Sequence, residues 1–134
     1  AIINGDTGKL MDLRALIVED EPALQQFYLK VLEKNDYHVD LACDGRAAID
    51  LLRAHPAPHL VILDVRLPDM DGIGVLEYMA QDHTLQRTHV VVASAGKEYE
   101  QYIRLMPSSE FLLKPILPSQ IMSIAQRIRD GQTA

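Results

Sequence analysis

The chain has 134 residues, the length of one ordinary domain. Its residues are 48% hydrophobic and 24% charged, which excludes a disordered or collagen-like chain, and its 7 scattered prolines exclude a long coiled coil. The net charge of −6 disfavours nucleic acid and anionic lipid as partners. No apolar run approaches the ~20 residues that cross a membrane, and the single cysteine, Cys43, cannot form an internal disulfide. We therefore expect a cytoplasmic domain that binds neither nucleic acid directly nor membranes.

The regular elements begin after a leader. Residues 1–12 carry Asn-Gly and Asp-Thr-Gly turn signals, and we interpret them as a linker from an upstream domain or as a non-native remnant before Met11. Short apolar runs then alternate with helical repeats. The expected strands are Leu13–Val18, Tyr37–Ala42, His59–Leu63, Thr88–Ala93 and Phe111–Leu113. The expected helices begin at Pro22 and then cover Asp44–Ala54, Asp71–Ala80, a short Lys97–Met106 and a last stretch from Leu117 to Ile128.

This order is a βα unit repeated five times. Several of the strands are apolar throughout rather than alternating, as in a parallel sheet that is covered on both faces. The sequence therefore predicts a three-layer open α/β sandwich with right-handed crossovers. We expect one domain over residues 13–130, with residues 131–134 as a tail.

Polar residues follow most of the expected strands. Glu19 and Asp20 end the first strand, Asp64 the third, Ser94 the fourth and Lys114 the fifth. The carboxyl ends of parallel strands meet at one edge of an open sheet, which is where such folds bind ligands. We therefore expect these three carboxylates, one hydroxyl and one ammonium group to converge.

The chemistry of this set follows from its charge. Carboxylates within a few Å of one another repel, unless a cation neutralises them. Mg²⁺ prefers oxygen ligands and is often shared with a phosphate, while Lys114 and Ser94 can bind the other phosphate oxygens. A carboxylate such as Asp64 can then act as a nucleophile and form an aspartyl phosphate.

Other proteins with this architecture fit less well. The acidic residues after the first strand would repel the phosphate of a flavodoxin cofactor. Neither glycine-rich nucleotide motif occurs in the chain. Aspartyl phosphatases of the haloacid dehalogenase type have a second Asp two residues after the nucleophile, where this chain has Arg66.

Taken together, these residues resemble the response-regulator receiver domain, the family of the chemotaxis regulator CheY. The resemblance covers about Leu13 to Arg129 and rests on four motifs, each weak alone but specific in this order and spacing. They are Glu19-Asp20, the acceptor region Asp64-Val65-Arg66-Leu67-Pro68-Asp69-Met70-Asp71-Gly72, Ser94-Ala95, and Phe111-Leu112-Leu113-Lys114-Pro115.

The resemblance implies a flavodoxin-like, five-stranded sheet in the order 2-1-3-4-5, with Asp64 as the phosphoacceptor. Mg²⁺ would be held by Glu19, Asp20, Asp64 and the backbone carbonyl of Arg66. Ser94 would follow the phosphoryl group inward together with Phe111, and Lys114, before a cis Pro115, would pair with its oxygens. The resulting population shift would change the surface of the fourth helix, fifth strand and fifth helix.

The resemblance also implies partners. The phosphoryl donor would be a histidine kinase or a histidine phosphotransfer protein, and the reader an output domain or a downstream protein. Whether the domain stands alone, belongs to a hybrid histidine kinase or comes from a multidomain regulator is open, as are self-dephosphorylation and a phosphorylation-dependent dimer. The segment Met106-Pro107-Ser108-Ser109-Glu110 departs from the small-residue turn of the family before strand five.

Plainer interpretations exist for the same residues. Glu19 and Asp20 could favour the start of the next helix through its dipole, Ser94 could be a turn residue, and Phe111 could be core packing alone. Two other functions are compatible with the fold: a binding module that works without phosphate, and a metal-dependent phosphatase that acts on outside substrates. The five histidines show no metal-ligand spacing, so we interpret them as structural or solvated.

Overall fold

The computed structural model of the chain describes residues 12–131. Most of the leader and of the tail, residues 1–11 and 132–134, lie outside the described residues. Strands and helices alternate in the expected order. The strands are β1 Arg14–Val18, β2 His38–Ala42, β3 Leu60–Asp64, β4 His89–Ser94 and β5 Ser109–Leu113. The α-helices are α1 Pro22–Lys34, α2 Gly45–Ala54, α3 Gly72–Ala80 and α4 Pro118–Arg129, and two 3₁₀ helices are η1 His83–Leu85 and η2 Lys97–Leu105.

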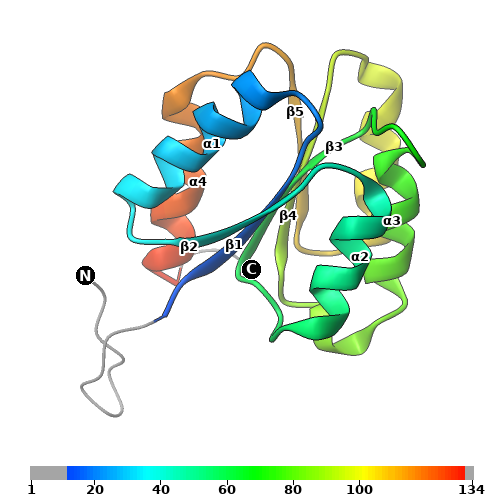
Figure 1. Cartoon of the computed structure of the whole chain (residues 1–134), viewed down its shortest axis with the longest axis horizontal. Helices are drawn as coiled ribbons and strands as arrows, with labels where there is room; N and C mark the ends of the chain where they lie inside the picture. Colours follow the sequence, from blue (N-terminus) through cyan, green and yellow to red (C-terminus); the bar gives the residue numbers. More distant parts are fainter. Residues whose placement is uncertain (1–11, 132–134) are drawn as a thin grey trace.

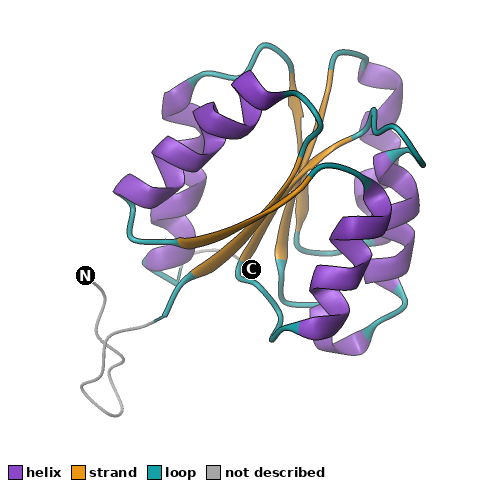
Figure 2. Ribbon diagram, in the orientation of Figure 1, coloured by secondary structure: helices purple, strands orange, loops and turns teal. Residues whose placement is uncertain are grey.

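The five strands form one parallel sheet in the order β2-β1-β3-β4-β5, as expected. Figure 1 shows α1 and α4 on one side of this sheet, and α2 and α3 on the other. The same three layers are visible in Figure 2, where the strands lie between two groups of helices. The predicted open α/β sandwich is therefore confirmed.

The core has two parts because neighbouring residues of a strand point to opposite faces. In β1, Ala15 and Ile17 pack with α1 and α4, whereas Leu16 and Val18 pack with α2 and α3. All five residues of β3 are buried. The unbroken apolar run of this strand thus reflects helices on both faces.

The sheet edges differ from the centre. Strand β2 has the sheet on one side only, and its Leu41 is 38% exposed.

The expected Lys97–Met106 helix is a 3₁₀ helix with no buried residue. Its two tyrosines, Tyr99 and Tyr102, are three residues apart, which matches three residues per turn and brings their rings to 6.3 Å. The helix ends before Met106, since Pro107 forces the preceding residue into an extended backbone.

Two polar residues outside the acidic cluster have contacts that hold the fold. Asp71 caps α3 by accepting a hydrogen bond from the Gly74 N–H at 3.2 Å. Among the histidines, His89 is buried and its ring forms a 2.5 Å hydrogen bond with the Glu110 carboxylate. It is the first residue of β4, at the opposite end of the strand from Ser94, so we interpret it as structural. No helix within residues 12–131 is long and apolar enough to span a membrane.

Two buried tyrosines give a matched test of the packing. The Tyr37 hydroxyl donates a 2.8 Å hydrogen bond to the Ala125 carbonyl, whereas the Tyr28 hydroxyl has no hydrogen-bond partner among the described residues. Tyr37→Phe should therefore lower the free energy of unfolding by about 1 kcal/mol, and Tyr28→Phe should leave it unchanged or raise it. Urea unfolding measures both. Equal destabilisation by the two substitutions would show that the Tyr28 hydroxyl is hydrogen-bonded.

Candidate functional site

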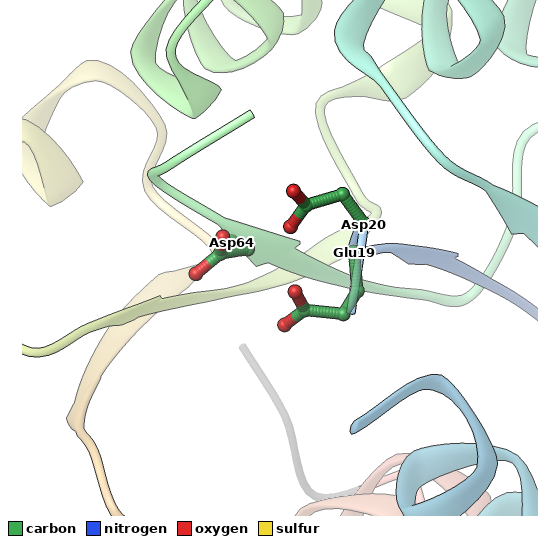
Figure 3. Close-up of side chains that lie close together, drawn as sticks. All are labelled: Glu19, Asp20 and Asp64. Atoms are coloured by element: carbon green, nitrogen blue, oxygen red, sulfur yellow. The ribbon is translucent and has the colours of Figure 1, made fainter. Parts of the chain in front are cut away.

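Three carboxylates meet where β1 and β3 end. The parallel pairing sets Val18 opposite Leu63, so the next residues, Glu19 and Asp64, lie side by side. Asp20 follows directly. One carboxylate oxygen from each acidic residue lies within 4.8 Å of the others. Figure 3 shows the three carboxylates around one shared space. The predicted convergence is therefore seen in the geometry.

Strands β4 and β5 add the remaining groups. Leu113 pairs with Ser94, and the Lys114 N–H donates a 2.8 Å hydrogen bond to the Ser94 carbonyl. This backbone bond places the Lys114 side chain over the acidic residues. Its Nζ lies 2.6 Å from Oδ1 of Asp64 and 3.5 Å from Oε1 of Glu19. The Lys114–Pro115 peptide bond is cis, as expected.

Burial and crowding shift the titration of these groups. Burial, together with the charge of Asp64, raises the pKa of Glu19 to about 7. Burial also raises the pKa of Asp64, although the hydrogen bond from Lys114 opposes it. For Lys114, burial alone would lower the pKa, but the bond to Asp64 outweighs burial and the pKa is raised. One ammonium therefore does not offset three carboxylates, and the site favours a further positive charge.

The donor set fits a hard divalent cation. Glu19 is 1% exposed, and apart from the 3.5 Å ion pair with Lys114 its Oε1 has no hydrogen-bond partner among the described residues. Asp20 is exposed, so the cluster opens to solvent on one side. Carboxylate oxygens around an open position are the ligands that Mg²⁺ prefers, because this ion usually keeps several waters.

The other expected site residues take distinct positions. Ser94 is buried, and its Oγ accepts a 3.0 Å hydrogen bond from the Gly96 N–H. Phe111 is partly buried against the core on the α2 and α3 face. Arg66 is exposed, and its backbone N–H lies near the Asp64 carboxylate, where it opposes the rise in the pKa of Asp64.

Glu19 also has a contact just before the next helix. The Glu19 carboxylate accepts a 3.2 Å hydrogen bond from the Glu21 N–H, which precedes α1. Sequence reasoning gave no role to Asp69, although its carboxylate binds the start of α2. The motif around the acceptor contains Asp69, but no periodicity or spacing indicates that this loop reaches α2.

Comparison with known proteins agrees with the geometry. A family profile described as the response regulator receiver domain matches residues 15–126. The polar-differentiation response regulator DivK of Brucella anthropi is 30% identical over 124 residues, which are 90% of this chain and 100% of that protein. The two-component response regulator ORR26 of Oryza sativa is 31% identical over 119 residues, 87% of this chain but 20% of that protein. The signal transduction histidine-protein kinase BarA of Escherichia coli is 30% identical over 128 residues, 94% of this chain and 14% of that protein.

Solved structures share the fold. The chemotaxis response regulator CheY4 of Vibrio cholerae superposes with a TM-score of 0.79 at 22% identity, covering 88% of this chain and 99% of that one. The signal receiver domain of a LuxO repressor protein from Vibrio parahaemolyticus gives a TM-score of 0.79 at 27% identity, covering 91% and 93% of the two chains.

The pKa of Glu19 predicts how metal-free stability depends on pH. The folded chain keeps a proton on Glu19 up to about pH 7, whereas the unfolded chain loses it near 4.5. Wild type therefore loses stability as the pH rises through this window. A glutamine at position 19 does not titrate, so it causes no such loss. The free energy of unfolding of Glu19→Gln should equal that of wild type near pH 4 and exceed it by about 3 kcal/mol above pH 8. Urea unfolding with a chelator present measures the difference.

The matched control is Glu77→Gln, which removes one negative charge at an exposed position of α3. Its stability should differ from wild type by a similar amount at both ends of the pH range. A difference between Glu19→Gln and wild type that stays constant with pH would contradict the raised pKa.

Proposed function

The chain belongs to the response regulator receiver domain family, whose known function is to accept a phosphoryl group, and from that premise we propose that Asp64 is the acceptor in this chain. The observation that carries the proposal is the 2.6 Å contact between Asp64 and Lys114 beside two more carboxylates. A carboxylate oxygen of Asp64 attacks the phosphorus atom and forms a new P–O bond. The P–N bond of a donor phosphohistidine breaks, and its electron pair stays on the imidazole nitrogen.

Glu19, Asp20 and Asp64, with the backbone carbonyl of Arg66, would hold Mg²⁺. The buried Oε1 of Glu19 supports this assignment, because among the described residues its one charged neighbour outside the acidic cluster is Lys114 Nζ, at 3.5 Å. When bound, Mg²⁺ neutralises the charge that gathers on the phosphoryl oxygens during transfer. The carboxylates hold their positions because β1 and β3 are both buried in the sheet.

Lys114 and Ser94 then bind the transferred group. Phosphorylation removes the full negative charge of the Asp64 carboxylate, so the Lys114 ammonium turns to the phosphoryl oxygens. Ser94 accepts from Gly96, which leaves its hydroxyl proton free to donate to the same group. Inward movement of Ser94 makes room for Phe111 to follow, and this changes the surface over η2, β5 and α4.

We infer that the donor is a histidine kinase or a histidine phosphotransfer protein, and that an output domain or a downstream protein reads the switch. DivK has about the length of this chain, whereas ORR26 and BarA are much longer. The relatives therefore include a stand-alone domain, a longer regulator and a kinase. The net charge of −6 and the acidic edge favour proteins over nucleic acid as partners.

Intact-mass spectrometry after incubation with acetyl phosphate tests the acceptor. Wild type should gain one phosphoryl group in Mg²⁺ and none with a chelator. Asp64→Asn should gain none under either condition, because the amide is a far weaker nucleophile. Asp50→Asn, at an exposed position of α2, is the matched control and should behave as wild type.

Three results would contradict the proposal. An adduct on Asp64→Asn at the wild-type rate would place the acceptor elsewhere. No adduct on wild type, with fluoroberyllate also failing to bind, would indicate a binding module that works without phosphate. Steady release of phosphate from a model ester would indicate a phosphatase.

A further inference from the structure

The loop from Val65 to Asp71, between the end of β3 and the start of α3, is closed at its base. The Gly72 N–H donates a 2.7 Å hydrogen bond to the Val65 carbonyl. A side chain at Gly72 would collide with the Asp64 carbonyl oxygen, so only glycine allows the loop to close here. We call residues 65–71 the acceptor loop, because both of its ends adjoin Asp64.

The tip of the acceptor loop is bound to a different helix. The Asp69 carboxylate accepts hydrogen bonds from the Gly45 N–H at 2.8 Å and from the Arg46 N–H at 2.9 Å, one on each oxygen. These are first-turn N–H groups of α2, which have no partner within their own helix. The hydrogen bond from Gly45 and the others at this terminus lower the pKa of Asp69, so the carboxylate is ionised at neutral pH.

A second contact joins the same two segments. The Met70 side chain covers Gly45, where a Cβ atom would overlap the methionine. It also lies against Gly74 in the first turn of α3. The acceptor loop is thus held against α2 by the hydrogen bonds of Asp69, and between α2 and α3 by the apolar contact of the neighbouring Met70.

These contacts bear on Asp64 through Arg66, which lies between the base and the tip of the acceptor loop. The backbone N–H of Arg66 lies close enough to the Asp64 carboxylate to oppose the rise in the pKa of Asp64. The Arg66 side chain is exposed and has no ion-pair partner among the described residues, so the Arg66 backbone depends on the rest of the loop for its orientation. Beyond Arg66, Leu67 packs against the core, and the bonds of Asp69 to α2 are the first hydrogen bonds that join this side of the loop to another element.

We propose that Asp69 is a positioning residue, whose hydrogen bonds to the N-terminus of α2 orient the backbone of Arg66 toward Asp64 and the metal. This role rests on the proposed function, because it needs Arg66 to supply a carbonyl ligand. Without the bonds to α2, the loop samples other conformations, and the metal must select the competent fraction. Loss of such an outer contact typically weakens metal affinity by about tenfold or more.

The chain offers a matched control at the same helix terminus. Asp44 also caps α2, through a 2.8 Å hydrogen bond from the Ala47 N–H, but it belongs to the segment between β2 and α2. Asp44→Ala and Asp69→Ala each remove one carboxylate from the start of α2. Only Asp69→Ala releases the acceptor loop.

The experiment measures Mg²⁺ affinity by calorimetry and the phosphorylation rate with acetyl phosphate, after urea unfolding has shown that each variant folds cooperatively. Asp69→Ala should weaken Mg²⁺ binding about tenfold and slow phosphorylation at low Mg²⁺, with recovery at saturating Mg²⁺. Asp44→Ala should lose stability and keep wild-type Mg²⁺ affinity. Asp69→Asn keeps one acceptor oxygen and should give an intermediate affinity, which also serves if the alanine variant fails to fold.

The outcomes separate the two proposals. Equal Mg²⁺ affinity in Asp69→Ala, Asp44→Ala and wild type would overturn the positioning role and leave Asp64 as the acceptor. A folded wild type that binds no Mg²⁺ would overturn the proposed function, and the positioning role with it.

Discussion

Repulsion among three carboxylates is the constraint on which the rest of the structure depends. Glu19, Asp20 and Asp64 place oxygens within 4.8 Å of one another, and two of these residues are buried. Like charges at such distances favour proton uptake or a cation. Lys114, just after β5, supplies one positive charge. Burial and the charge of Asp64 still raise the pKa of Glu19. Carboxylate oxygens gathered in this way are the ligands that a hard divalent cation prefers.

The fold explains how these charges are kept together. The strand order of the parallel sheet reverses between β1 and β3. The chain therefore leaves these two strands toward opposite faces of the sheet, and a crevice stays open at their carboxyl ends. Apolar strands covered by helices on both faces hold that edge rigid (Figure 2). The acceptor loop is closed at its base, and its tip binds α2. The acidic residues at the strand ends are thus joined to the helices on one face of the sheet.

Much of this was predictable from the sequence, for physical reasons. Apolar runs such as Leu60–Leu63 indicate buried parallel strands, and the polar residue after each run indicates the site. The lone acidic and basic residues at strand ends therefore predicted Glu19, Asp64 and Lys114 as neighbours. Contacts between loops were not predictable, because they follow no period: the Asp69 bonds to α2 have no sequence signal. The 3₁₀ form of η2 also escaped, since its weak apolar pattern does not distinguish three residues per turn from 3.6.

The central claim is that the buried, cation-dependent carboxylate at the end of β3 carries the phosphoryl group. Borohydride reduction tests it most directly, because it converts an aspartyl phosphate to homoserine and so marks the acceptor permanently. After incubation with acetyl phosphate and Mg²⁺, reduction and proteolysis, tandem mass spectrometry should find homoserine at position 64 and aspartate at position 20. Homoserine at position 20, or a phosphorylated chain in which residue 64 remains aspartate, would contradict the account.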